Sequence, residues 1–425
     1  MKFLVYIMVL FFTVPVIAQD NVYPAKKQEG TLVIRNGIVH TGTGQVIQGG
    51  VVVIKDGKIQ KVGDQVEAVP GAAEVDAAGK HVYPGLILAN TDLGLREIIS
   101  GVRGSNDYYE LGDYNPDVRS IVAYNTDSRV INTLRSNGIL LANIVPAGRL
   151  LTGSSSVVQL DAWTWEDALY KADNGMFLDL PMLLKSPRAG AADPVKEGMK
   201  RIETLKLFLQ EAKAYSRSAE KKEVNLKFEA LRPLFAKKQK LFINANISRQ
   251  ILMAIDLAKT FDIQVVIVGG SDSYLLAGLL RQNNIPVILN SIHALPTLED
   301  DDVDQPFKTP AILQKAGVLF ALNDDETSAR YRNLAFFAGT AAAYGLSKQE
   351  ALQAITLNAA RILGIDDRAG SLEAGKDANI VITTGDILDM KESVVTEAYI
   401  QGRKINLDNK HKQLYDRYRH RYQLP

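Results

Sequence analysis

Four places in this sequence carry residues whose types and spacing bear on metal or proton chemistry. At the first, Asn90 and Asp92 stand two residues apart at the end of the apolar run VYPGLILAN. On a strand, both side chains would project to the same side, which is how one strand offers two ligands to one metal ion. Zinc prefers imidazole, thiolate or carboxylate ligands. Asp92 therefore qualifies, whereas the neutral amide of Asn90 is a weak ligand.

The other three places also follow apolar runs: Asn244 in LFINAN, Gly269 in VVIVGG and Asp325 in FALNDDE. Asn244 has the same limitation as Asn90, and Gly269 offers no side chain. Asp325 keeps a carboxylate that could bind a metal or act as general base toward water. Oxygen ligands of this kind suit Mg²⁺, Mn²⁺ or Ca²⁺. We favour a wet cavity without a cofactor, with a divalent ion (Zn²⁺, Mn²⁺ or Mg²⁺) as the alternative.

Two further residues are candidates for substrate binding. Of the five histidines, only His293, in NSIHALP after the seventh apolar run, could reach the same place. A single histidine in a loop is also common as a surface or hydrogen-bonded residue. Ser154 lies in GSSSVVQL, where backbone N–H groups could contact a substrate, although a Gly-Ser segment can simply form a turn.

The elements that must position these residues alternate along the chain. Eight strand-like runs appear, at VYPGLILAN, GILLANIV, SSVVQLDAW, MFLDLP, LFINAN, QVVIVGG, PVILNS and VLFALND. Helical patterns separate several of them, as in SRQILMAIDLAK, and Ser347 with Glu350 forms a capping box before another helix. Strands that alternate with helices predict parallel pairing, and about eight of them close into a TIM-like (β/α)8 barrel. We assign this α/β barrel to residues 81–369.

Both ends of the chain predict a second, smaller domain. Residues 31–65 contain short β-branched runs broken by NG, GG and DG, which are tight-turn signals. The same texture returns at about 371–405. We expect residues 19–80 and 370–405 to form one composite β-sandwich domain.

Two charged segments stand apart from this pattern. Residues 194–239 are helical in pattern and predict a helical insertion on the barrel surface. The C-terminal tail, 406–425, interleaves Arg with Tyr, a texture that could stack on nucleic acid. A packed or frayed terminal helix is the better interpretation, since the net charge of the chain is only +1 and predicts no nucleic-acid partner.

The N-terminus predicts export. Residues 1–18 begin with Lys2, continue as an apolar run, and end with the small residues that signal peptidase requires. The run is shorter than the roughly 20 residues that span a bilayer, and no later segment is long and apolar enough. The chain has no cysteine, so neither disulfides nor a lipid-modified cysteine are expected. We predict a periplasmic or extracellular protein that is not a lipoprotein and has no membrane span.

Several blocks of the sequence resemble the amidohydrolase superfamily, particularly the branch related to imidazolonepropionase. They are NGIVHTGTGQVI, AAGKHVYPGLI, LRSNGILLANIVPAG, AYGLSKQEALQAITLNAARILGI and GSLEAGKDANIVI. The resemblance implies a TIM-like barrel beside a β-domain built from both chain ends. It also implies hydrolysis of non-peptide C–N bonds, such as those of cyclic amides or imidazolones, and frequent dimers.

The functional residues of this family carry over only in part. Its first-strand His-x-His falls on Asn90 and Asp92, its fifth-strand His on Asn244 and its sixth-strand His on Gly269. Its eighth-strand Asp matches Asp325, with Asp324 beside it as an alignment alternative. All four histidines are absent, so the resemblance does not extend to the zinc centre.

Two hypotheses follow. In the first, which we favour, the barrel is weak or inactive in metal-dependent hydrolysis and serves in binding a small molecule or in pairing, as a homodimer or with an intact relative. In the second, the chain is an active C–N hydrolase with a rebuilt carboxylate site that uses Asp325 as general base and Asp92 to hold a metal or orient water.

Overall fold

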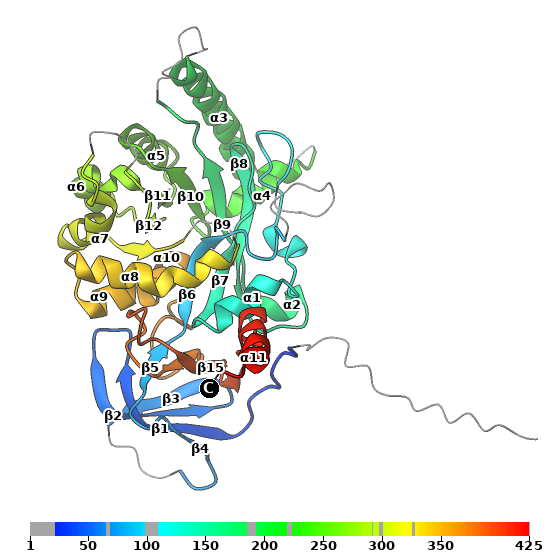
Figure 1. Cartoon of the computed structure of the whole chain (residues 1–425). Coiled ribbons are helices and arrows are strands. Elements are labelled where there is room, and N and C mark those ends of the chain that lie inside the picture. Colours follow the sequence, from blue (N-terminus) through cyan, green and yellow to red (C-terminus); the bar gives the residue numbers. More distant parts are fainter. Residues whose placement is uncertain are drawn as a thin grey trace, which may run out of the picture.

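The structure of the chain is a computed structural model that describes residues 22–64, 69–97, 109–184, 193–218, 223–290, 292–296, 301–324 and 328–424. Two eight-stranded sheets organise it, one at the base of the molecule and one in its middle (Figure 1). The predicted signal peptide, 1–18, lies outside the described residues. Within the described ranges, no helix combines the length and the apolar character that a bilayer crossing requires.

The middle sheet is the predicted barrel, and it is nearly closed. Its strands pair in the order in which they occur in the chain. They are β6 (Leu86–Thr91), β7 (Ile139–Ile144), β8 (Leu151–Gln159), β9 (Leu169–Asp179), β10 (Lys240–Ala245), β11 (Val265–Gly269), β12 (Val287–Leu289) and β13 (Phe320–Leu322). Each of the eight runs singled out in the sequence contributes one strand, which confirms the α/β barrel.

One strand differs from the expectation of parallel pairing. β8 runs antiparallel to both β7 and β9, whereas the other neighbouring pairs of the barrel are parallel. The physical reason is connection length. Only residues 145–150 join β7 to β8, whereas a parallel crossover needs roughly a dozen residues or more. The carboxyl end of β8 therefore lies at the opposite end of the barrel from those of its neighbours.

Helices cover the barrel where the connections are long enough. They are α1 (Arg129–Arg135), α2 (Trp165–Ala168), α5 (Ser248–Phe261), α6 (Ala277–Gln282), α7 (Gln305–Lys315), α8 (Leu334–Ala343) and α9 (Lys348–Ala354), with the 3-10 turns η1 (Ser120–Ala123), η2 (Ser271–Leu276) and η3 (Ser328–Asn333). The predicted capping box is present at α9. The Ser347 Oγ accepts from the Glu350 N–H at 3.2 Å, and the Glu350 Oε2 accepts from the Ser347 N–H at 2.8 Å.

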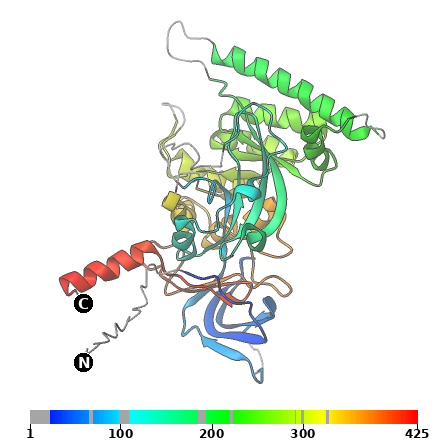
Figure 2. The same ribbon diagram turned by 90° about the vertical axis from the view of Figure 1, so that its right-hand side faces the viewer.

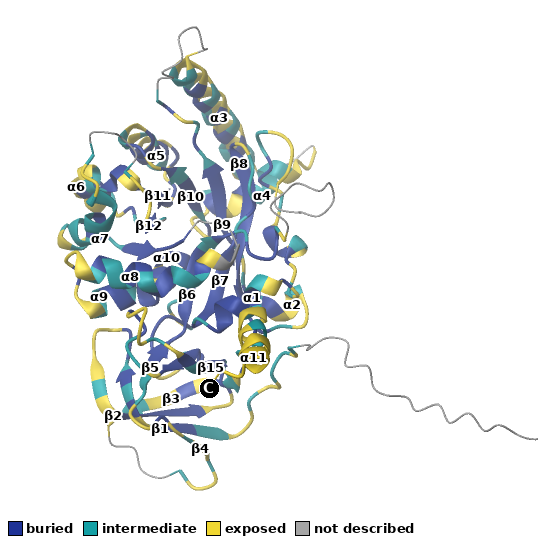
Figure 3. Ribbon diagram, in the orientation of Figure 1, coloured by how far each residue is buried: buried dark blue, intermediate teal, exposed yellow. Residues whose placement is uncertain are grey.

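The barrel interior is apolar and is closed at its base by α10 (Leu357–Leu363). Phe177, Phe242 and Val266 of the strands pack with Ile362 and Leu363 of this helix. Figure 3 shows the strands of the barrel as buried. The interior is thus a packed core, and the chemistry of the barrel must lie above it, at the mouth.

The second sheet confirms that the two ends of the chain meet in one unit. Its path is β16 (Arg403–Lys404), β15 (Val395–Ile400), β14 (Ile380–Thr383), β5 (His81–Pro84), β1 (Thr31–His40), β2 (Val46–Lys55) and β3 (Lys58–Gly63), with β4 (Ala73–Asp76) also paired to β1. Ile34, Val52 and Ile380 belong to one buried apolar cluster of this sheet. Residues from the two termini therefore share a core that is separate from that of the barrel.

The two charged segments are helical. α3 (Pro194–Arg217) and α4 (Leu226–Phe235) lie between β9 and β10, and α3 stands at the end of the molecule far from the composite sheet (Figure 1). α11 (Lys410–Tyr422) has no buried residue. It projects away from the body of the protein (Figure 2). The tail therefore forms a helix whose start lies against the body, with Gln413 and Leu414 partly buried, and whose remainder is exposed.

Candidate functional site

The mouth of the barrel carries a layer of amide side chains and one carboxyl group. Leu141, Phe177, Phe242, Ile288 and Ala321 belong to the interior core, and residues two positions further along a strand share its face. Those positions hold Asn143, Asp179, Asn244, Asn290 and Asn323. We call this set the amide layer. Asp179 is its single ionisable member.

The two end strands of the barrel sheet, β6 and β13, are joined by the side chain of Asn323. Its side chain is fully buried. The Nδ2 of Asn323 donates to the backbone oxygen of Asn90 at 2.9 Å, and its Oδ1 accepts from the backbone N–H of Asn90 at 3.0 Å. The same Nδ2 lies 3.0 Å from the Oδ1 of Asn290. One amide thus links the ends of β6, β12 and β13, which makes this part of the mouth a structural network.

Asn143 extends the layer onto β7. Its Nδ2 donates to the backbone oxygen of Ala89 at 3.1 Å. Its Oδ1 is fully buried and meets no hydrogen-bond donor among the described residues. A buried acceptor without a donor carries a desolvation cost. The floor of the mouth is therefore polar, and the Oδ1 of Asn143 lacks a hydrogen bond among the described residues.

Asp179 is the residue of the layer best suited to proton chemistry. It ends β9, and its Oδ1 accepts a short hydrogen bond from the Nδ2 of Asn244 on β10. Burial raises the pKa of Asp179 from 3.8 to about 6, and the hydrogen bond from Asn244 opposes part of this rise. A carboxyl group with a pKa near 6 exchanges a proton close to neutral pH, which is what general acid–base catalysis requires.

Asp92 is engaged by two other side chains. Its Oδ1 accepts from the hydroxyl of Tyr331 at 2.6 Å, and its Oδ2 pairs with the guanidinium of Arg96 at 2.8 Å. Burial first, and then the charge of Asp92, raise the pKa of Tyr331, so the phenol stays protonated and donates. Both oxygens of the carboxylate are therefore occupied by protein groups, and a metal would have to displace the Arg96 ion pair.

Gly269 has a backbone conformation that excludes a histidine. Its φ is +95°, and a Cβ atom there would lie 2.2 Å from the Oδ1 of Asn246. Side chains on L-residues are strained at such φ values. A ligand at this place would thus require both a different backbone and a displaced Asn246.

The remaining predicted residues do not join the amide layer. Asp325, the candidate general base, lies outside the described residues. His293 is exposed, shares a 2.7 Å hydrogen bond with the hydroxyl of Thr340 on α8, and packs on the ring of Phe337 at 4.4 Å. Ser154 lies on the antiparallel strand β8, where its Oγ accepts from Gln239, the residue that precedes β10. That places Ser154 toward the base of the barrel.

The donor set around the mouth does not fit a transition-metal centre. Of the four positions matched to family histidines, Asn90 and Asn244 carry neutral amides, Gly269 carries nothing, and Asp92 is paired with Arg96. Across the described ranges, no group of three His, Cys, Asp or Glu side chains is placed to hold a metal ion. Zinc sites in proteins use several imidazole, thiolate or carboxylate ligands, so the residues at the mouth do not fit a zinc centre.

A cavity of about 270 Å³ opens beside the amide layer, and it is lined in part by Asn290, Asp272, Tyr274, Met182 and Leu295. No Lys or Arg is among its described lining residues. Asp272 is buried, and its Oδ2 accepts from both the N–H and the hydroxyl of Ser248 at 2.7 and 2.9 Å. This fixed carboxylate at the start of α5 makes the cavity unfavourable for an anionic ligand.

Four residues of the amide layer were not predicted from the sequence: Asn143, Asp179, Asn290 and Asn323. A usable signal was present, because each stands two residues after an apolar residue at the end of a predicted strand, as in MFLDLP, PVILNS and FALND. Counting the period of two from the apolar interior would have found them.

Comparison with known proteins agrees with the fold. Residues 290–405 match the model of the amidohydrolase family. The crystal structure of an amidohydrolase from Thermotoga maritima is 27% identical in sequence, with a TM-score of 0.76 over 88% of this chain and 99% of that chain. A comparison with curated proteins gave no match.

More distant structures share the fold alone. A Xaa-Pro dipeptidase with bound methionine is 14% identical, with a TM-score of 0.56 over 89% of this chain and 100% of that one. Molinate hydrolase is 16% identical, with a TM-score of 0.53 over 89% and 95%. The family match over residues 290–405 and the similarity to the Thermotoga maritima structure support an amidohydrolase-type barrel with a composite sheet. Among the described residues, the mouth of this barrel lacks a metal-binding donor set.

Proposed function

We propose that this protein is an amidohydrolase-fold binding protein whose barrel mouth holds a small polar ligand and does not carry out zinc-dependent hydrolysis. The observation that carries the proposal is the engagement of Asp92 by Arg96 and Tyr331, together with amides or glycine at the other matched positions. The ligand is small, because a cavity of about 270 Å³ lies just below the range of about 300–1,000 Å³ for small-molecule sites. It is neutral or cationic, because Asp272 lines the cavity.

The energetic argument concerns water. A metal lowers the pKa of its bound water from 15.7 to about 7, and each pKa unit is worth about 1.4 kcal/mol. Amide side chains supply no comparable activation. A single carboxylic acid such as Asp179 can move a proton but cannot generate hydroxide at neutral pH.

The test measures metal and ligand together. The purified protein is dialysed against Zn²⁺ and, separately, Mn²⁺, and its metal content is determined by mass spectrometry. We expect well below one ion per chain, and no change in the Asp92→Asn variant. One tightly held ion per chain that is lost in Asp92→Asn would overturn the proposal. A thermal-shift screen of small amides and amines then identifies ligands of the mouth.

A second function has one observation in its favour, the pKa of about 6 at Asp179. In this alternative the chain hydrolyses a cyclic amide or imidazolone-type C–N bond without a metal, and Asp179 acts as the acid or base in addition to the predicted Asp325. Turnover of lactams, imides or dipeptides that requires Asp179 and follows an ionisation near pH 6 would establish it. Turnover that survives Asp179→Asn would assign the activity elsewhere.

We also propose that the chain is exported and pairs with another subunit, either a second copy or an intact relative. Export is supported by the composition of residues 1–18. N-terminal sequencing of the protein from its native host should begin at Gln19. Size-exclusion chromatography with light scattering, followed by mass spectrometry of co-purifying chains, distinguishes a homodimer from a mixed complex.

A further inference from the structure

The C-terminal helix α11 is anchored at its start, where Gln413 and Leu414 are partly buried, and it is exposed along the rest of its length. The side chain of Asn409 caps it by accepting from the N–H groups of His411 and Lys412 at 2.9 and 3.0 Å. The Nδ2 of the same Asn409 donates to the buried Oγ of Ser136 at 2.7 Å, which fixes the cap to the barrel. Beyond this anchor, no residue of the helix is buried.

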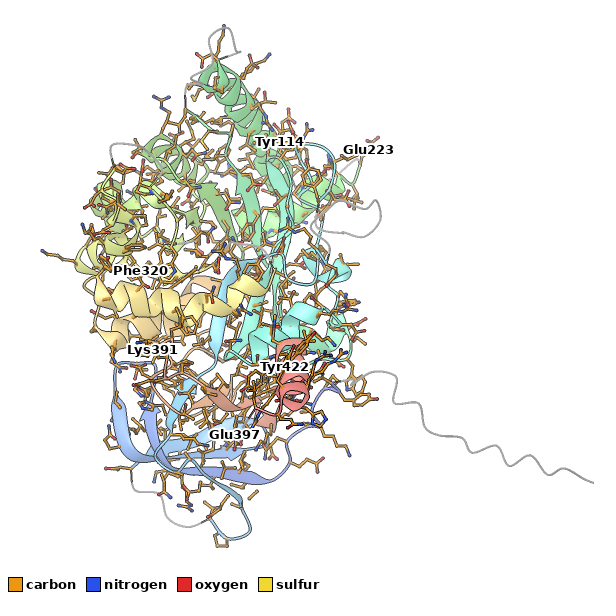
Figure 4. All side chains as sticks on the ribbon, in the orientation of Figure 1. Tyr114, Glu223, Phe320, Lys391, Glu397 and Tyr422 are labelled. Carbon is orange, nitrogen blue, oxygen red and sulfur yellow. The ribbon has the colours of Figure 1, made fainter. Side chains whose placement is uncertain are left out.

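A helix of this length needs an external contact. Isolated helices shorter than about 12–15 residues are marginal in water, and most helical stability in proteins comes from packing. α11 has 13 residues, and it projects from the body with Tyr422 near its far end (Figures 2 and 4). Tyr415, Tyr418 and Tyr422 are 64%, 49% and 63% exposed. Three exposed aromatic side chains on a helix without a buried residue indicate a surface that another body contacts.

The aromatic residues lie on one stripe. At about 100° per residue, Tyr415, Tyr418 and Tyr422 fall within an arc of about 60° that also contains His411, and Leu414 lies about 40° outside it. The stacked rings of Tyr418 and Tyr422, 6.3 Å apart, agree with this placement. Tyrosine, which has an apolar ring and a polar hydroxyl, is enriched at the boundary between lipid and water.

Basic residues border the stripe on both sides. By the same helical spacing, Lys412 and Arg419 lie along one border, and Lys410 and Arg421 along the other, with Arg417 further round the helix. The single acidic residue of the helix, Asp416, lies about 40° beyond Lys412 on the side away from the stripe. Such long side chains can extend their cationic ends past the aromatic stripe toward phosphates. A second copy of α11 would carry the same charges and be repelled, so the partner must be anionic.

We propose that α11 is a peripheral membrane-docking helix that lies on an anionic phospholipid surface, with its tyrosine stripe at the headgroup level and its bordering Lys and Arg residues on the phosphates. This arrangement is the one expected of an interfacial amphipathic helix. It differs from a membrane span, since the helix lies along the surface. The inference is independent of what the barrel mouth binds.

The binding test uses the full-length mature protein and vesicles. Flotation is measured with phosphatidylcholine alone and with a mixture containing about one-third phosphatidylglycerol. We expect binding to the anionic vesicles only, weakening with added salt. Because each basic residue near an anionic surface contributes roughly fivefold, the double variant Lys412→Gln/Arg419→Gln should bind roughly 25-fold more weakly.

A matched control separates the helix from general charge. Lys259→Gln/Lys315→Gln removes two exposed lysines from α5 and α7 and should bind vesicles as the unmodified protein does. Tyr418→Ser/Tyr422→Ser should weaken binding at constant charge. Equal binding to both kinds of vesicle, equal weakening in the control, or no effect of the tyrosine changes would each overturn the proposal. So would binding to polyglutamate or DNA without binding to anionic vesicles, which would assign α11 to an acidic macromolecule.

Discussion

The two ends of the barrel are built from different side chains. At the mouth, the strands end in amides, and the single carboxyl group of the amide layer, Asp179, is hydrogen-bonded to an amide. At the base, buried charges are matched by opposite charges. Asp377, whose side chain is 5% exposed, accepts from the hydroxyl of Tyr170 at 2.6 Å and pairs with Lys58 and Arg368 at 2.8 and 3.0 Å. The base is organised for stability, whereas the mouth lacks the donor set of a metal site.

Lysines reinforce the base of the barrel. Lys240 donates to the backbone oxygen of Ile362 at 2.6 Å, and Lys171 to that of Leu363 at 3.0 Å. These carbonyl groups end α10, where the helix dipole favours a positive charge. The segments that most resemble the amidohydrolase superfamily, TLNAARILGI and GSLEAGKDANIVI, include α10 and Asp377. Their persistence therefore reports packing at the base and carries no information about chemistry at the mouth.

The largest predicted effect is at the base. Asp161 is fully buried between Arg135 and Arg403, and its Oδ2 also accepts from the N–H of Ala25 at 2.8 Å. Asp161→Asn leaves the side chain of Arg135, 4% exposed, without its counter-charge. Removing one partner of a buried pair costs about 3–5 kcal/mol, so the free energy of unfolding in urea should fall by that amount.

An exposed ion pair provides the control for this change. Asp262, which pairs with Lys237 at 2.8 Å, is 78% exposed and has a left-handed backbone that asparagine tolerates. Asp262→Asn should change stability only slightly, because exposed ion pairs contribute little. Equal losses in the two variants would mean that the base does not depend on buried charge.

The next prediction concerns Asp179 and pH. Because the pKa of this carboxyl rises from 3.8 unfolded to about 6 folded, the folded protein binds its proton more tightly. Stability should therefore fall as pH rises from about 4 to 6, by at most about 3 kcal/mol. Asp179→Asn removes this ionisation. The difference in unfolding free energy between the unmodified protein and the variant, measured from pH 4 to 7, should decrease across that window; a constant difference would contradict the raised pKa.

Gly269 tests whether the mouth could regain a ligand. Gly269→Ala places a Cβ 2.2 Å from the Oδ1 of Asn246 at a φ of +95°, and it should destabilise the protein by about 2 kcal/mol. Gly278→Ala on α6 meets nothing within 4 Å and should be neutral or stabilising by up to about 1 kcal/mol. Thermal unfolding of the two variants measures the contrast. A tolerated alanine at 269 would show that the mouth can be remodelled.

The strands of the barrel were predictable because their apolar runs are continuous and buried on both faces, as in VVIVG of β11. The antiparallel direction of β8 follows from the short connection of residues 145–150, and the length of that connection can be read from the sequence. The composite sheet followed from turn dipeptides at both chain ends. These features depend on local residue patterns and on the lengths of connections, and both can be read directly from the sequence.

The contacts at the mouth were not predictable in the same way. Nothing in the sequence indicates that the hydroxyl of Tyr331, 239 positions from Asp92, donates a hydrogen bond to that carboxylate and occupies one of its oxygens. The bond between Asp179 and Asn244 likewise depends on the register of β9 against β10, in which these two residues are paired. The absence of histidines could be seen in the sequence, whereas what replaced them required the three-dimensional arrangement.

The smallest predicted change in unfolding free energy concerns the start of α11, where the helix leaves the body of the protein. The Nδ2 bond of Asn409 to Ser136 is the last buried polar contact before α11, and no residue of the helix is buried. Deleting residues 411–425 while keeping Asn409 should therefore change the free energy of unfolding by less than about 0.5 kcal/mol, and Asn409→Ala in the full-length chain should cost about 1 kcal/mol through the lost cap and buried bond. Urea unfolding measures both. A larger loss on deletion than on substitution would show that α11 packs on the barrel in solution, and it would then belong to the base of the molecule.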